Sequence, residues 1–243
     1  MKFFSFAPSQ GNVVWIEPNR LVAGGKVVVT GDIATEDQLA IALNSLPAGP
    51  TKWILDDLIA PSIIVKDIIE VPNGAEAKEA FFRWKYCQVL SLEGVHAVQG
   101  ISLGEHGWLL SGMPLAIQES WLALATRLGR PAHAVIPRWL WLYNRAAPTR
   151  EKPGMLLSLC QTNPGNYTGS IATWGRLLTL VRQWPDEAPV GAWITDRIEP
   201  TVAFLQRDGK TPMEILVWGP EDWPDGSLPH QVFQSIIPSQ EAI

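Results

Sequence analysis

The adjacent acids Asp56 and Asp57 could form a reactive pair. Two neighbouring carboxylates can divide the work of a general acid and a general base. They follow a short apolar run, 52–55, however, and acids in that position more often cap a turn or face solvent. We therefore expect a cap or a solvated face, and keep acid–base chemistry as the alternative.

The histidines and cysteines lack the spacing of a metal site. His96 and His106 flank an expected hairpin and could meet across its strands, but structural or surface roles are expected for every histidine. Cys87 and Cys160 lie inside apolar runs, where free thiols pack as small hydrophobic side chains. Free cysteines without a disulfide pattern are typical of proteins in the reducing cytoplasm. The four histidines are His96, His106, His133 and His230.

No nucleophile stands out in the sequence. Cys160 has no neighbouring histidine or basic residue, which argues against a catalytic thiolate. Three serines, Ser111, Ser158 and Ser170, lack the G-x-S-x-G context of a hydrolase. We therefore expect no catalytic residue.

Arg83 and Trp84 are the candidate partner-binding residues. They lie within an expected helix, 75–90, whose basic residues predict a solvated face. The chain holds 12 tryptophans, and tryptophan is enriched where proteins bind partners. The alternative is therefore that Arg83 and Trp84 contact an acidic partner.

The composition excludes several classes of protein. Of 243 residues, 47% are hydrophobic and 18% charged, as in folded globular proteins. The net charge of -5 and the lack of a basic patch argue against nucleic-acid binding. The apolar runs are shorter than the ~20 residues of a membrane-spanning helix, and no signal peptide is recognised. We expect a cytoplasmic protein that reaches the membrane only through partners.

Alternating and helical patterns predict a mixed α/β chain. The first half is expected to hold strand–turn–strand at 12–30, a helix capped by Thr35, strands at 52–55 and 62–71, a helix at 75–90, a hairpin at 95–112, a helix at 114–128, a strand at 133–136 and a helix at 137–145. After a breaker-rich boundary at 147–154, the second half is expected to hold a three-stranded meander at 155–181, a helix at 190–205 interrupted by Pro200, a strand at 212–217 and an irregular tail at 224–243.

This order of elements resembles the PilM/GspL group of actin-like proteins, which serve type IV pilus and type II secretion assembly. The resemblance implies an α/β, actin-like (RNase H-like) fold with two lobes, reduced in size, and mixed sheets flanked by helices. The segments that carry it are the strand region 54–72 ending at Pro72, Arg83-Trp84-Lys85 in the helix 75–90, the helix 113–128 before Gly129, the apolar helix 139–146 and the ending 199–223.

The resemblance also implies a division of the chain. A first lobe would span 1–148, with a core at 1–74 and an inserted subdomain plus closing helix at 75–147. A second lobe, with the irregular tail, would span 149–243.

Nucleotide binding in actin-like proteins needs two tight phosphate turns, each with a glycine for close backbone approach and an acid for Mg²⁺ or water. At the first turn Glu17 stands where the acid is expected, but Pro18 replaces the glycine. At the second, Cys160 and Gln161 occupy the positions of acid and glycine, and Gly219 precedes a proline at the adenosine strand. These departures predict a degenerate site with no cofactor, no metal and no catalysis.

The resemblance therefore implies a non-catalytic cytoplasmic scaffold, peripheral to the inner membrane. Its expected partners are the PilN-like tail of an inner-membrane assembly protein and, in GspL-like systems, a motor ATPase. One alternative is a nucleotide-binding switch that uses Glu17 and holds ATP and Mg²⁺ in a non-standard site. Another is an unrelated α/β binding module.

Overall fold

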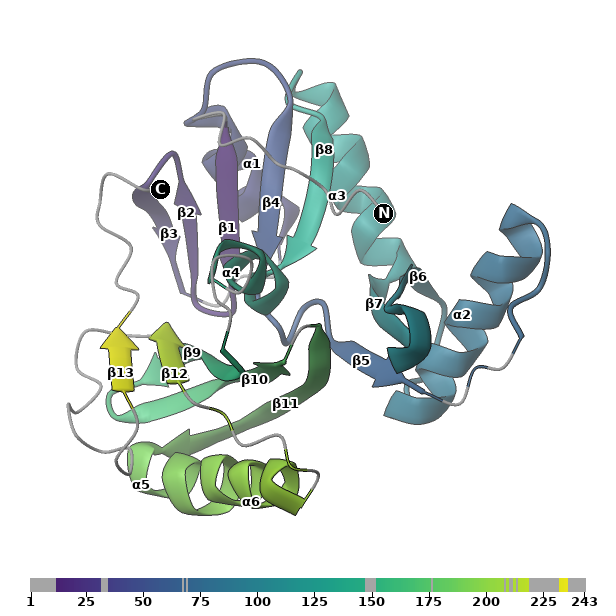
Figure 1. Ribbon diagram of the computed structural model, residues 1–243. Helices are drawn as coiled ribbons and strands as arrows, with labels where there is room; N and C mark the ends of the chain where they lie inside the picture. The colour runs from purple at the N-terminus through teal and green to yellow at the C-terminus, as the bar shows by residue number, and fades with distance from the viewer. Residues whose placement is uncertain are drawn as a thin grey trace. The chain divides into compact units, whose positions relative to one another are not determined.

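Two compact units make up the described chain in the computed structural model (Figure 1). The first contains the described parts of Met1–Leu55 and Gln118–Ile136, and the second those of Asp56–Ile117 and Pro137–Ile237. None of the helices within the described ranges is long and apolar enough to cross a membrane. The residues described are 12–31, 35–66, 68, 70–146, 152–175, 177–207, 209, 212, 214–218 and 232–235.

The first unit is built on a five-stranded mixed sheet. β1 runs antiparallel to β2 and parallel to β4, and β2 and β3 form a hairpin. The hairpin turns at Gly24 and Gly25, whose φ angles of 56° and 79° favour glycine. The strands are β1 (Val13–Glu17), β2 (Arg20–Ala23), β3 (Lys26–Thr30), β4 (Thr51–Leu55) and β8 (Ala132–Pro137), in the spatial order β3-β2-β1-β4-β8.

Two helices pack on this sheet. α1 (Glu36–Asn44) contacts β2 and β3, and begins where the Thr35 side chain accepts a hydrogen bond from the Gln38 N–H at 3.4 Å. α3 (Leu115–Arg127) brings Trp121 edge-on to Trp53 of β4, with ring centroids 6.3 Å apart. Both tryptophans are buried, so this contact forms part of the core of the first unit.

A small antiparallel sheet with one helix forms part of the second unit. Its strands β5 (Ser62–Val65), β6 (His96–Ser102) and β7 (Trp108–Pro114) lie in the order β5-β7-β6, with a 3-10 turn, η1 (Gly104–His106), between β6 and β7. α2 (Ala75–Leu90) packs on β6 and β7. The helix buries Phe82 and Tyr86 against Val98 and Leu110.

The larger sheet of the second unit repeats the strand order of the first unit's sheet. β9 runs antiparallel to β10 and parallel to β12, which pairs in parallel with β13. Both sheets are therefore a three-stranded meander extended by further strands beside its first strand. The strands are β9 (Gly154–Asn163), β10 (Asn166–Trp174), β11 (Leu178–Pro189), β12 (Glu214–Trp218) and β13 (Val232–Ser235), in the order β11-β10-β9-β12-β13.

Helices cover both faces of this larger sheet (Figure 1). On one face Met155, Leu157 and Ile171 pack with Trp193 and Leu205 of the C-terminal helical segment. On the other face α4 contacts β9 and β10. Because side chains alternate along a strand, one face is apolar and the other carries the buried serines described below. The helical elements are α4 (Arg138–Ala146), α5 (Val190–Ala192), the π-helical turn η3 (Trp193–Ile198) and α6 (Glu199–Arg207).

Pro200 does not end the C-terminal helical segment. The Glu199 N–H bonds to the carbonyl of Ile194, five residues back, in the wider π-helical turn that precedes the proline. Proline has no N–H and cannot continue the regular ladder of hydrogen bonds. The wide turn therefore lets the chain pass Pro200 and continue as α6.

Most of the predicted elements are present. The helix predicted at 75–90 is α2 with identical bounds, and the hairpin predicted at 95–112 is β6–β7. The meander predicted at 155–181 is β9–β10–β11, although β11 continues to Pro189. The predicted boundary segment, 147–154, includes residues outside the described ranges. The proposed division of the chain at 148 therefore stays a prediction.

Three local predictions are wrong. The strand predicted at 62–71 ends at Val65, which pairs with Trp108, the first residue of β7. The tail at 224–243 contains a strand, β13, because β12 supplies a parallel partner for it. His96 and His106 do not meet: His96 pairs with Pro114 at the open end of the hairpin, whereas His106 lies in its turn.

Candidate functional site

The acids Asp56 and Asp57 are both buried, each 1% exposed, in the turn after β4. The Leu58 N–H donates to Asp56 Oδ1 at 2.8 Å, so the side chain of Asp56 closes its own turn. The Asp56 carbonyl accepts hydrogen bonds from the N–H groups of Ile59 and Ala60. The predicted cap is confirmed, whereas the predicted solvated face is wrong.

Arg138, at the start of α4, is the cation that accompanies these acids. Its side chain is fully buried, with Nη1 2.8 Å from Asp56 Oδ2 and Nη2 3.9 Å from Asp57 Oδ2. Its guanidinium also lies 5.4 Å from the ring centroid of Trp218 on β12. A buried charge of this kind requires pairing, because isolated ions are strongly disfavoured away from water.

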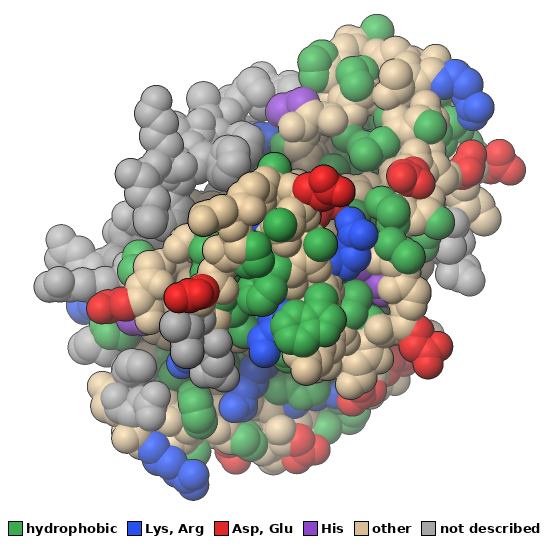
Figure 2. All heavy atoms as spheres, turned by 90° about the vertical axis from the view of Figure 1, so that its right-hand side faces the viewer, with side chains coloured by type: hydrophobic (Ala, Val, Ile, Leu, Met, Phe, Trp, Pro, Cys, Tyr) green, Lys and Arg blue, Asp and Glu red, His purple; other side chains and the backbone are tan. Residues whose placement is uncertain are grey.

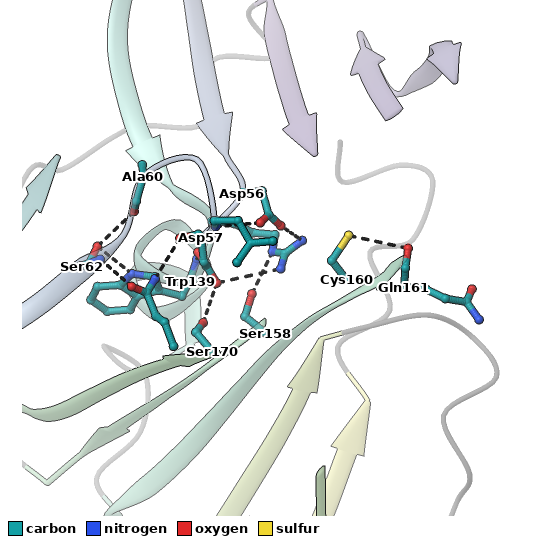
Figure 3. A network of polar contacts seen from close by, with 12 residues as sticks. Asp56, Asp57, Ala60, Ser62, Trp139, Ser158, Cys160, Gln161 and Ser170 are labelled. Carbon is teal, nitrogen blue, oxygen red and sulfur yellow. Dashed lines mark hydrogen bonds and ion pairs between the residues drawn. The ribbon is translucent and has the colours of Figure 1, made fainter. Parts of the chain in front are cut away.

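Two serines of the sheet complete the network (Figure 3). Ser158 of β9 and Ser170 of β10 are direct partners across the antiparallel ladder, so their side chains share one face. Arg138 Nε donates to Ser158 Oγ at 2.9 Å, and Ser170 Oγ donates to Asp57 Oδ2 at 2.5 Å. The network therefore joins the turn at Asp56, the start of α4 and the β9–β10 hairpin.

A second set of hydrogen bonds extends from Asp57 toward β5 and β11. The Trp139 N–H donates to Asp57 Oδ1 at 3.2 Å, and Trp139 Nε1 donates to Ser62 Oγ at 3.1 Å. The Ser62 N–H donates to Gln183 Oε1 at 2.6 Å, and Gln183 Nε2 donates to the Asp57 carbonyl at 3.4 Å. Every donor here comes from an element that packs around the acid turn, so the network ties these elements together.

The positive charge of Arg138 does not fully compensate the two buried carboxylates. Burial raises the pKa of Asp57 above its ordinary value, and Arg138 and the hydrogen bonds from Ser170 and Trp139 only partly oppose that rise. The reason is that one guanidinium serves two carboxylates and lies much closer to Asp56. Ionising Asp57 therefore carries a free-energy cost in the folded protein.

The sequence indicated only part of this network. The adjacent acids Asp56 and Asp57 form a recognisable pair, whereas Ser158 and Ser170 lack the sequence context of a nucleophile and carry no other local signal. Arg138 was not identified as functional, although it is a single charge between the apolar runs 134–136 and 139–142. A lone arginine in an apolar stretch is a usable signal, because buried charges need partners.

The predicted first phosphate turn lies between β1 and β2. Glu17 is the last residue of β1 and is buried, and its carboxylate forms an ion pair with Arg20 at the start of β2. Pro18 and Asn19 make the turn, and the Asn19 carbonyl accepts the Gly31 N–H at 2.8 Å. This turn is therefore closed by contacts within the first unit.

The residues predicted for the second phosphate turn lie inside a strand. Cys160 and Gln161 belong to β9 and pair with Thr168 and Tyr167 of β10, and the hairpin turns further on at Asn163–Asn166. The β9 and β10 backbones approach closely at Gly169, where a Cβ would lie 2.1 Å from the Ser158 carbonyl oxygen. Gly219, the third predicted position, lies outside the described residues.

The predicted partner-binding residues lie on α2. Arg83 Nη2 pairs with Glu79 Oε1 at 2.8 Å one turn earlier, and Trp84 is 56% exposed. Lys85 Nζ lies 5.7 Å from the centroid of the Trp84 ring. Both predicted residues line a surface hollow of about 440 Å³.

No group of three or more His, Cys, Asp or Glu side chains in the described ranges could hold a metal ion. His133 Nδ1 lies 2.7 Å from the Thr51 carbonyl oxygen, a structural contact, whereas His230 lies outside these ranges.

Two solved structures are similar to most of the chain. One is the cytoplasmic domain of EpsL, an inner-membrane component of the type II secretion system of Vibrio cholerae: it is 15% identical, with a TM-score of 0.54, over 92% of this chain and 88% of that one. The other is a Bacteroides thetaiotaomicron protein with an actin-like ATPase fold and unknown function: it is 10% identical, with a TM-score of 0.56, over 92% of this chain and 89% of that one.

No protein-family model matches the chain, and no curated protein matches it. The structural likenesses, together with the repeated strand order of the two five-stranded sheets, show that the chain has an actin-like fold. The predicted fold class is therefore confirmed.

Proposed function

We propose that this actin-like protein is a non-catalytic scaffold of a type II secretion or type IV pilus assembly machine. The observation that carries the proposal is the buried pairing of Asp56 and Asp57 with Arg138. In an actin-like fold that hydrolysed ATP, a carboxylate beside the phosphate turns would bind Mg²⁺ or position water. Here the acids beside the β9–β10 hairpin are engaged by a guanidinium instead.

The charge of Arg138 supports the same conclusion. A divalent cation placed beside Asp56 or Asp57 would meet a fully buried positive charge, and their repulsion would be strong in a poorly solvated site. A metal ion that displaced Arg138 from Asp56 and Asp57 would separate its buried guanidinium from both carboxylates. The network therefore favours a fixed, stabilising role over reversible metal binding.

The two predicted phosphate turns also support the proposal. Pro18 removes a backbone N–H from the first turn, and its neighbour Glu17 is paired with Arg20. Cys160 and Gln161 offer neither an acid nor a glycine and lie within the β9 ladder. A scaffold keeps such elements for packing and needs none of the phosphate contacts.

The proposed partners follow from the resemblance and from the EpsL domain, which belongs to an inner-membrane component of a secretion system. They are the cytoplasmic PilN-like tail of an inner-membrane assembly protein and a motor ATPase. The protein would act in the cytoplasm and reach the inner membrane through these partners.

Isothermal titration with ATP and Mg²⁺ tests the non-catalytic part. We expect no saturable heat at millimolar nucleotide and no phosphate release above a no-protein control. Binding in the micromolar range that depends on Mg²⁺, or steady hydrolysis, would contradict the proposal. Titration with peptides from the cytoplasmic tails encoded by neighbouring assembly genes tests the scaffold part, with scrambled peptides as controls.

A nucleotide-binding switch is the second candidate, and buried Glu17 at the end of β1 is the observation that favours it. Such a switch would show ATP-dependent protection from proteolysis, and Glu17→Gln would abolish that protection. If ATP leaves the protease pattern unchanged in both proteins, the switch is refuted.

A further inference from the structure

Cys87 and His96 form a thiol–imidazole pair that the sequence did not reveal. Cys87 lies on α2 and His96 is the first residue of β6, and the Cys87 Sγ is 3.7 Å from the His96 Nδ1. In the tautomer with its proton on Nε2, the His96 Nδ1 accepts a hydrogen bond from the Cys87 thiol. A base within reach of a thiol is the arrangement that activates a cysteine as a nucleophile.

The pair lies beside the hollow of about 440 Å³ on α2, and Cys87 lines it. Cys87 is partly exposed, whereas the other cysteine, Cys160, is buried. Arg83 precedes Cys87 by four residues, so the two side chains lie on the same face of the helix. The remaining lining residues are Ala80, Trp84, Gln88, Leu92 and Gly94.

Arg83 has donor capacity left for an anion. Only its Nη2 is paired, with Glu79, and its buried Nε has no hydrogen-bond partner within the described part of the chain. Exposed Trp84 lies beside it in the lining of the hollow, and Val89 and Val95 nearby in the sequence are also exposed. Figure 2 views this side of the molecule and shows hydrophobic side chains at the surface next to Lys and Arg side chains.

We propose that Cys87 is a modification site that takes up a small anionic thiol from its disulfide. His96 accepts the Cys87 proton, and the thiolate attacks the nearer sulfur of the disulfide. The disulfide's own S–S bond breaks, and its second sulfur leaves as a thiolate with the electron pair. Cys87 is oxidised to a mixed disulfide, one sulfur of the reagent is reduced, and Arg83 holds the reagent's carboxylate.

This inference does not depend on the proposed function. If Arg83 and Trp84 do contact a protein partner, a mixed disulfide at Cys87 would occupy the same hollow and compete with that partner.

The test compares two disulfide reagents on the folded protein: anionic 5,5′-dithiobis(2-nitrobenzoate) and uncharged 4,4′-dithiodipyridine. We expect one fast-reacting thiol, absent in Cys87→Ser, and a second that reacts only in denaturant. Arg83→Met should slow the anionic reagent by at least about threefold more than the uncharged one, because it removes the cation beside the thiol. Lys85→Met, with equal charge change on the same helix but outside the lining, is the control.

Chemical rescue tests the role of His96. We expect His96→Ala to slow both reagents, and added imidazole to restore the rate; pyrazole, similar in shape but a far weaker base, should not. The absence of a fast-reacting thiol in the native protein would overturn the proposal. It would also be overturned if Arg83→Met slowed both reagents equally, or if Arg83→Met and Lys85→Met had equal effects. Equal rescue by both azoles would refute proton transfer to His96.

Discussion

Replacing Arg138 tests whether the buried network holds the second unit together. In Arg138→Met, Asp56 loses a cation at 2.8 Å and Asp57 loses one at 3.9 Å. Ser158 Oγ loses the hydrogen bond from Nε. Removing one partner of a buried ion pair typically costs about 3–5 kcal/mol, because an uncompensated charge is left behind. With two acids stranded, we expect a loss toward the upper end of that range.

The loss should depend on pH in a defined direction. The folded-state pKa of Asp57 is already raised above its ordinary value, and removing Arg138 removes the charge that lowers it. The folded variant then binds protons more readily than the unfolded chain, so its stability falls as pH rises. The deficit relative to the wild type should therefore be larger at pH 7 than at pH 5.

Equilibrium urea unfolding, followed by tryptophan fluorescence at both pH values, measures this deficit. Arg83→Met is the matched control, because its pair with Glu79 is on the surface and should cost about 0–1 kcal/mol. If Arg138→Met does not fold, the double variant Arg138→Met with Asp56→Asn leaves one buried acid and should recover stability. A deficit below about 1 kcal/mol at pH 7 would refute the network's role, as would an equal deficit at both pH values.

Three further predictions concern single residues. Asp57→Asn removes an acid whose pKa burial raises, so its stability relative to the wild type should rise with pH in urea unfolding, and a constant difference would contradict this. Gly169→Ala should destabilise by about 2–3 kcal/mol, because its Cβ would lie 2.1 Å from the Ser158 carbonyl oxygen; a neutral thermal shift would show that the strands can separate there. Thr35→Ala should cost about 1 kcal/mol in the same unfolding assay, because α1 loses its N-cap, whereas Thr35→Ser should cost much less.

Local patterns were sufficient to predict most elements of this fold. The bounds of α2 follow from helix formers between Gly74 and Ser91, a left-handed residue that ends the helix. The hairpins follow from alternation and turn residues. These signals depend on residues close together in the chain, so they can be recognised in a single sequence. The strand β13 was missed because its partner β12 supplies the ladder, and composition alone gave no sign of it.

The candidate site was less predictable because its members are distant in the chain. Asp57 bonds to Ser170 across 113 positions and to the Trp139 N–H across 82, and no local pattern encodes either contact. The nine-residue separation of Cys87 and His96 is short, yet their meeting depends on how α2 packs against β6.

The sequence by itself determined the α/β class and the positions of most helices and hairpins, whereas the degenerate phosphate turns at Pro18, Cys160 and Gln161 stay a prediction from the resemblance. Those properties depend on residue type and short-range periodicity. Only the tertiary structure decided that Asp56 and Asp57 are buried against Arg138 and that Cys87 has a base beside it. The physical reason is that burial and charge pairing are set by which elements pack together, and these elements meet only when the chain folds.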